Sequence, residues 1–128
     1  MVWTTTPTRC APGRPNARVE RFIPQSELLP RCSAVVDHGG SGTVLGALAH
    51  GLPQLVLPQS ADNFINAEMI EQSGLGQRLL PEEVIPDAIA RAVVDVLADP
   101  APARRAAAEI ATMPAPCEIA HILRERYS

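Results

Sequence analysis

The segment AVVDHGGSGT, residues 34–43, decides how the fold of this chain is interpreted. An apolar run with β-branched residues at its centre ends at Asp37, and a glycine-rich loop over 38–43 follows directly. This pattern predicts a buried strand of the parallel type over 34–37. The apolar positions 44, 45, 48 and 49 then have helical spacing, and Gly51 is suited to end that helix. We therefore expect a strand, a glycine-rich turn and a helix.

The same order of elements is repeated further along the chain. Residues 54–57 predict the next strand, Asp62 is expected to cap a helix over 63–73, and residues 77–80 predict a short edge strand. Strands that alternate with helices predict an α/β fold, a Rossmann-like parallel sheet with flanking helices. Because the carboxyl ends of parallel strands share one sheet edge, the loops 38–43 and 58–63 should face the same crevice.

The flanking segments complete the expected organisation. Residues 1–17 are rich in Pro, Thr and Arg and predict an irregular leader, so the domain is expected to cover 18–128. Residues 18–23 predict a short strand that ends at Pro24, with one helical turn over 25–29 after it. Further helices are expected over 86–98, 103–112 and 118–126.

Composition excludes several classes of function. The 128 residues carry a net charge of −3, which argues against nucleic-acid binding, and all 11 basic residues are Arg. Without Lys the chain can form neither a Schiff base nor a P-loop. The 3 cysteines lack a CxxC pair, which argues against a disulfide framework and a zinc site. We expect reduced thiols, a cytoplasmic protein, no signal peptide and no membrane span.

The glycine-rich loop has the groups of an anion site. His38 and the hydroxyls of Ser41 and Thr43 surround glycines at the start of a helix, where backbone N–H groups and the helix dipole favour a phosphate. A tight turn with a Ser or Thr cap is the alternative. In the second loop, Asp62 and Asn63 offer the acceptors and donors that bind sugar hydroxyls, although Asp at a helix start is also an ordinary cap.

Two better-known glycine motifs do not fit. The hydrolase nucleophile elbow needs Gly-x-Ser-x-Gly, whereas the glycine after Ser41 comes one position early. The dinucleotide fingerprint GxGxxG is absent. The loop is therefore better explained as a phosphate site of another kind.

Several short motifs in order give a more specific indication. They are FIPQ at 22–25, LLP at 28–30, VVDHGGSGT at 35–43, HGLPQ at 50–54, Pro58, DN at 62–63 and NA at 66–67. In this order and spacing the chain resembles the donor-binding C-terminal domain of GT-B glycosyltransferases. The resemblance covers about residues 18–126 and is nearest to the bacterial group that decorates macrolides and other antibiotics with sugars from dTDP or UDP donors.

The resemblance implies a role for each site residue. The donor diphosphate would be held by His38, Gly40, Ser41, Gly42 and Thr43. Asp62 and Asn63 would bind the sugar hydroxyls, and Ile23, Pro24 and Gln25 would lie against the nucleobase. It also implies direct displacement with inversion, without a metal or another cofactor, because the helix end stabilises the leaving diphosphate.

The chain departs from the family pattern in three respects. Asn63 stands where Gln is usual, and Gly46 stands where the plant branch has an acidic residue for the ribose. The N-terminal domain that binds the acceptor and supplies the catalytic base has no counterpart here, so we expect the donor domain to be incomplete and the chain alone to be inactive. A separate N-terminal half or a second copy are the expected partners; a non-catalytic nucleotide-sugar-binding or interaction remnant is the alternative.

Overall fold

The computed structural model describes residues 15–128. Most of the expected leader, together with Cys10, lies outside the described residues. The elements are α1 (Gln25–Leu28), η1 (Leu29–Arg31), β1 (Val35–Asp37), α2 (Ser41–Ala49), β2 (Gln54–Val56), α3 (Asp62–Gln72), β3 (Gly76–Arg78), η2 (Pro81–Glu83), α4 (Pro86–Ala98), α5 (Ala101–Ala111) and α6 (Pro116–Tyr127).

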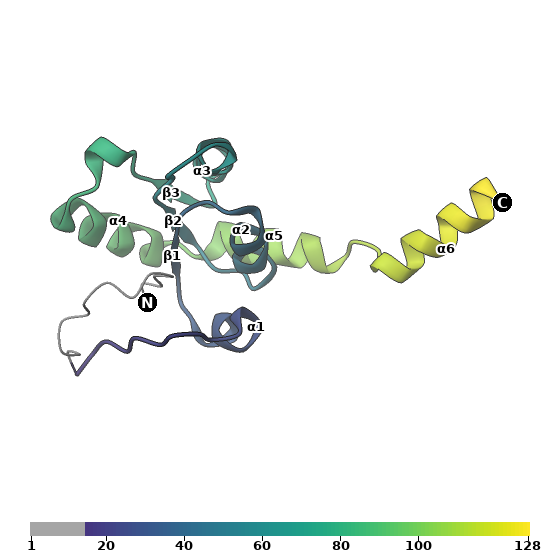
Figure 1. Cartoon of the computed structure of the whole chain (residues 1–128), viewed down its shortest axis with the longest axis horizontal. Coiled ribbons are helices and arrows are strands. Elements are labelled where there is room, and N and C mark those ends of the chain that lie inside the picture. Colours follow the sequence, from purple (N-terminus) through teal and green to yellow (C-terminus); the bar gives the residue numbers. More distant parts are fainter. Residues whose placement is uncertain (1–14) are drawn as a thin grey trace.

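The three strands form one parallel sheet in the order β1-β2-β3. Val36 lies opposite Leu55, and Leu55 lies opposite Gln77. Helices α2 and α3 connect successive strands and cover one face of the sheet, whereas α4 packs on the other face, as Figure 1 shows with the sheet nearly edge-on. The expected Rossmann-like α/β fold is thus confirmed.

All three residues of β2 are buried, because this strand lies between β1 and β3 in the sheet. Its Val56 packs with Val44, Ala67 and Ile70 beneath α2 and α3, in line with the alternation of side chains along a strand. Gln54 points to this same face, where its amide donates to the Val44 carbonyl at 3.2 Å. A second cluster of Leu29, Ala47 and Leu52 attaches α1–η1 to α2.

Two expectations about the first strands were wrong. Residues 18–23 form no strand, and Val19 and Phe22 are 61% and 73% exposed. Val19 and Phe22 would lie on opposite faces of a strand, and Arg21 would lie on the same face as Val19, so neither face of this segment is continuously apolar. The strand β1 is half-buried rather than buried, because it lies at the edge of the sheet.

The helices begin close to the expected positions. The helix α4 has the expected bounds and starts with Pro86. The helices α5 and α6 each begin two residues earlier than expected, and the Glu118 side chain accepts the Ala115 N–H at 2.7 Å at the start of α6. Helix α3 begins at Asp62, so Asp62 is its first residue and not the cap.

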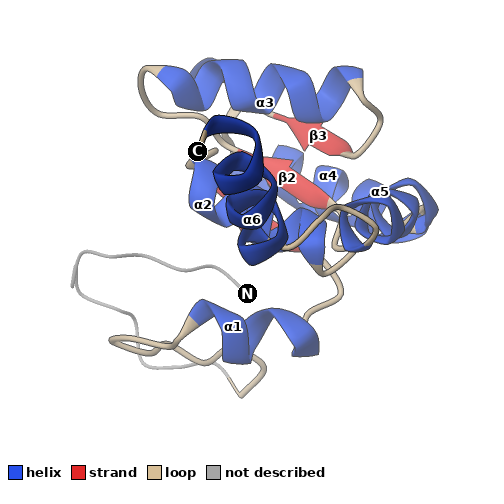
Figure 2. Ribbon diagram, turned by 90° about the vertical axis from the view of Figure 1, so that its right-hand side faces the viewer, coloured by secondary structure: helices blue, strands red, loops and turns tan. Residues whose placement is uncertain are grey.

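The helix α6 extends away from the body of the domain in Figure 1, and Figure 2 views the chain from that side, with α6 in front of the domain. Every residue of α6 is exposed, including Ile119, Ile122 and Leu123. No helix among residues 15–128 is both long and apolar enough to cross a lipid bilayer.

Candidate functional site

The start of α2 presents backbone donors at the carboxyl edge of the sheet. Gly40 precedes the helix, and the Val44 N–H donates to the Gly40 carbonyl at 3.0 Å. An α-helix leaves its first N–H groups without partners inside the helix, so those of Ser41, Gly42 and Thr43 are available to a ligand. A Cβ built on Gly42 would meet no heavy atom within 4 Å. The tip of α2 is therefore open.

Gly39 lets the loop turn sharply out of β1. Its φ is +87°, and a Cβ there would lie 2.8 Å from the Asn63 carbonyl oxygen and 3.0 Å from Val56 Cγ1. The Gly39 N–H donates to Asp37 Oδ1 at 2.7 Å, and its carbonyl accepts the Asn66 amide at 2.8 Å. Only glycine combines this φ with such close packing. The loop is thus fixed from both sides.

Asp37 is the first residue of this network that the sequence did not single out. Burial raises the pKa of its carboxyl above the ordinary value of 3.8, while the Gly39 N–H and nearby His38 act in the opposite direction. Its Oδ2 is buried and has no hydrogen-bond partner among the described residues. An acidic residue at the end of an apolar strand was the signal that could have identified it.

The second loop meets the first one. The Asn63 N–H donates to the Ser60 carbonyl at 2.9 Å, which closes a turn with Ala61 at φ 42° and ψ −122°. Asp62 is exposed, whereas Asn63 is only 7% exposed and its backbone packs on Gly39. The expected convergence of the two loops at one edge of the sheet is confirmed.

The segment expected at the nucleobase lies beside α2. A Cβ on Gly46 would come within 3.4 Å of Gln25 Oε1 and within 3.2 Å of Leu29 Cδ1. Gly42 and Gly46 are four residues apart and lie on the same side of the helix. Gln25 is therefore about one turn along α2 from the open tip, and Ile23 and Pro24 directly precede α1. His38 is exposed next to the tip, and its imidazole lies over Gly40.

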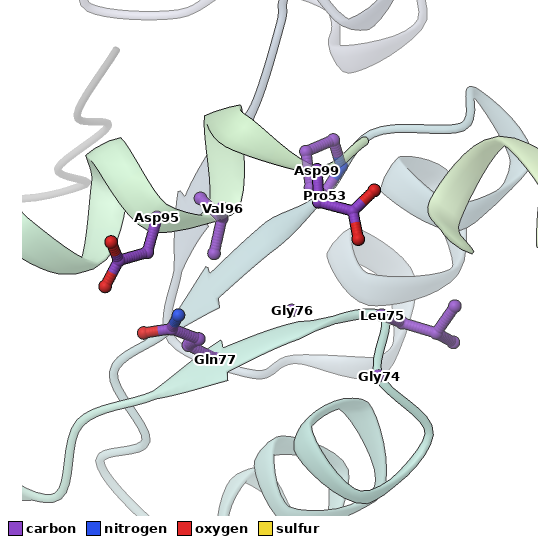
Figure 3. A pocket seen from close by; sticks show the side chains of 8 residues that line it. All are labelled: Pro53, Gly74, Leu75, Gly76, Gln77, Asp95, Val96 and Asp99. Atoms are coloured by element: carbon purple, nitrogen blue, oxygen red, sulfur yellow. The ribbon is translucent and has the colours of Figure 1, made fainter. Parts of the chain in front are cut away.

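Two hollows in the surface of the domain lie away from these loops. A cavity of about 140 Å³ (Figure 3) is bounded by Pro53, by residues 74–77, by Asp95 and Val96 of α4 and by Asp99, which follows that helix. A larger one of about 490 Å³ includes Cys32, His50 and Arg104. Both are at the amino ends of the strands, opposite the two loops. The loops thus form a surface at the other edge of the sheet, consistent with one wall of a site.

Comparison with known proteins gives a family match over residues 7–126, to the model described as "Erythromycin biosynthesis protein CIII-like, C-terminal domain". The elloramycin glycosyltransferase ElmGT of Streptomyces olivaceus is 46% identical over 109 residues, which are 83% of this chain and 27% of that protein. The 3-alpha-mycarosylerythronolide B desosaminyl transferase of Saccharopolyspora erythraea is 37% identical over 113 residues, 86% of this chain and 27% of that protein.

Solved structures agree with these relatives. The glycosyltransferase VinC in complex with dTDP superimposes with a TM-score of 0.81 at 29% identity, over 88% of this chain and 29% of that one. The spinosyn rhamnosyltransferase SpnG gives 0.82 at 32% identity, over 90% and 32%. The chain thus spans roughly a quarter to a third of the length of the proteins that it matches.

Proposed function

Because this chain belongs to the family of erythromycin biosynthesis protein CIII-like C-terminal domains, we propose that it binds the nucleotide-diphosphate sugar donor of a glycosyltransferase. The GT-B resemblance expected from the sequence is confirmed by the family match and by the solved structures. One of these, VinC, holds dTDP. The donor proposed here is accordingly a dTDP- or UDP-sugar.

The open tip of α2 is the observation that carries the proposal. Its free N–H groups, the hydroxyls of Ser41 and Thr43 and the exposed His38 would hold the diphosphate, with Gly40 and Gly42 allowing close approach. The same donors would stabilise the negative charge that develops on the diphosphate as its bond to the sugar breaks. Fixed donors and the helix dipole supply this stabilisation, so the proposal includes no metal and no cofactor.

The remaining contacts follow from the position of the loops around that tip. Asp62 is exposed at the start of α3, and Asn63 is adjacent, so we assign the sugar hydroxyls to this pair. Ile23, Pro24 and Gln25 are assigned to the nucleobase, which is supported by the contact between Gln25 and the side of α2. These assignments put the diphosphate between the sugar and the nucleobase, as in a nucleotide-diphosphate sugar.

Transfer of the sugar requires groups that we do not assign to this chain. We propose that a separate N-terminal half supplies the acceptor site and the base that deprotonates the acceptor hydroxyl, a natural-product alcohol. The acceptor oxygen would then bond to the anomeric carbon of the sugar as the bond to the diphosphate breaks, so the nucleoside diphosphate leaves and the configuration is inverted. The two relatives named above are transferases, which favours this function over a non-catalytic nucleotide-sugar-binding or interaction remnant.

Calorimetry tests the donor site directly. We expect the chain to bind dTDP and UDP, and His38→Ala to weaken both by about tenfold, as for the loss of one hydrogen bond to a charged group. His121→Ala is the matched control, because His121 is an exposed histidine on α6 that contacts Glu125. A folded sample that binds neither nucleotide would refute the proposal. A labelled-sugar transfer assay, with and without a candidate second polypeptide, tests the transfer step.

A further inference from the structure

Asn66 of α3 connects the two loops of the candidate site. Its Nδ2 lies 2.8 Å from the Gly39 carbonyl oxygen and 3.2 Å from Ser41 Oγ. A carbonyl oxygen can only accept a hydrogen bond, so the atom in contact with it must be the amide nitrogen. The orientation of the Asn66 side chain is therefore determined by chemistry, and its second hydrogen is directed to Ser41.

This contact determines what the Ser41 hydroxyl can do. A hydroxyl has one hydrogen to donate and two lone pairs that accept. The nitrogen of Asn66 has no lone pair available to accept, so Ser41 Oγ is the acceptor of this bond. The hydrogen of the Ser41 hydroxyl then remains free for another acceptor. Ser41 is exposed at the open tip of α2, where such an acceptor would be an anion.

We propose that Asn66 is a positioning residue that orients the Ser41 hydroxyl as a hydrogen-bond donor toward the donor diphosphate. The inference rests on the proposed function of the α2 tip. The bonds form a chain in which the Asn66 amide donates to Ser41 and Ser41 donates to a phosphate oxygen. Each bond in such a chain polarises the next one, so Asn66 would strengthen the contact without touching the ligand.

The other bond of Asn66 gives this arrangement its rigidity. The Gly39 carbonyl accepts a hydrogen bond from the Asn66 amide, and the Gly39 N–H donates one to the Asp37 carboxylate. Because Gly39 also packs on the backbone of Asn63, the glycine loop and the start of α3 form one unit. The residue assigned to the diphosphate and the pair assigned to the sugar would therefore keep a fixed relative position when the donor binds.

Double-mutant calorimetry with dTDP tests this role. We expect Asn66→Ala to weaken dTDP binding by about fivefold to tenfold, within the range for one hydrogen bond. In a Ser41→Ala background the same change should weaken binding by less than about twofold, since the bond through which Asn66 acts is already gone. Equal losses in both backgrounds would show that Asn66 is only a structural support and would overturn the inference.

An isosteric change gives a second, sharper test. In Asn66→Asp the carboxylate can only accept, so Ser41 would donate to it and turn its lone pairs toward the phosphate. We expect Asn66→Asp to weaken dTDP binding more than Asn66→Ala does. Gln72→Glu makes the same change of charge on the exposed end of α3 and is the control. Equal or weaker loss in Asn66→Asp than in Asn66→Ala would contradict the inference.

NMR gives a readout that needs no Asn66 variant. The side-chain NH₂ signals of Asn66 should shift when dTDP is added, remain in place with thymidine, which has no phosphate, and shift less with dTDP in Ser41→Ala. Unshifted Asn66 signals in a wild-type chain that binds dTDP would refute the role of Asn66 and leave the proposed function intact. Failure of the wild-type chain to bind dTDP would instead refute the proposed function.

Discussion

The two junctions between strand and helix at the site both turn the chain sharply, but they differ in the residue that adopts the positive φ. Each contains one residue with positive φ, Gly39 between β1 and α2 and Ala61 between β2 and α3. Gly39 adopts this φ without a Cβ and is fixed by two side-chain hydrogen bonds. Ala61 carries a Cβ at φ 42° and belongs to a turn closed by one backbone bond. The first junction is relaxed and tightly held, whereas the second stores strain.

Replacement of Gly39 should have the largest effect. A Cβ there would be 2.8 Å from a backbone oxygen, and the left-handed φ disfavours any side chain. We expect Gly39→Ala to lower the free energy of unfolding by about 3 kcal/mol, because crowding and lost hydrogen bonds add to the conformational cost. Urea denaturation measures the change.

Gly74 provides the matched control for that experiment. Its φ is +69°, yet a Cβ there would meet no heavy atom within 4 Å. Gly74→Ala should therefore lose only about 1 kcal/mol, which is the conformational cost alone. Equal losses of unfolding free energy in the two variants would mean that close packing around Gly39 does not add to the cost of a side chain there. The first junction would then not be more tightly held than an ordinary turn.

Replacement of Gly42 should change ligand binding and stability in opposite directions. Gly42→Ala adds a methyl group in open space on a helix, so we expect a gain in the free energy of unfolding of about 0.5–1 kcal/mol. The same methyl group would occupy the surface assigned to the diphosphate, and dTDP affinity should fall about tenfold. Calorimetry and denaturation of one variant measure both effects. Unchanged affinity would place the diphosphate elsewhere.

The sequence predicted the first junction better than the second, for a physical reason. The local backbone of the first junction follows from its residue types, because glycines and hydroxyl residues before a helical pattern predict a turn and a helix. The structure contains both. Ala61 gave no signal, because alanine does not favour a positive φ and the tertiary contacts impose it. The start of α3 at Asp62, one residue early, follows from the same turn.

Side-chain networks were also beyond prediction from the sequence. Asp37 and Asn66 lie 29 residues apart in the chain and belong to one network only because each forms a hydrogen bond with the backbone of Gly39. The segment 18–23 was mistaken for a strand because its residue types were considered without a partner strand. Local patterns thus gave the order of elements, whereas the contacts across the sheet edge came from the structure.

Asp37 makes the first junction sensitive to pH. Its carboxyl has a pKa above 3.8 because it is buried, so the folded state binds the proton more tightly than the unfolded state does. The contribution of Asp37 to stability is therefore present below pH 3.8 and is lost as the pH rises through the folded-state pKa. Asp37→Asn keeps an acceptor for the Gly39 N–H and carries no charge, so it should gain stability relative to wild type as the pH rises through this window.

Urea denaturation of wild type and Asp37→Asn at a series of pH values measures this difference. The two stability curves should diverge as the pH rises from 3.8 and become parallel above the folded-state pKa. Asp95→Asn, which removes an exposed carboxylate from α4, is the control for the change in net charge. Parallel curves over the whole range would mean that burial does not raise the pKa of the Asp37 carboxyl.

The second junction can be relaxed by a single change, Ala61→Gly. Glycine adopts φ 42° and ψ −122° readily, and removal of the strain should stabilise the folded chain by about 1–2 kcal/mol. The greater freedom of glycine in the unfolded chain offsets about 0.5–1 kcal/mol, so the expected net gain is about 0.5–1 kcal/mol. Ala49→Gly, at the exposed end of α2, should lose stability by a similar amount and is the control. A loss of stability in Ala61→Gly, measured by the same denaturation, would show that this turn is not strained, and the two junctions would then differ only in how tightly they are held.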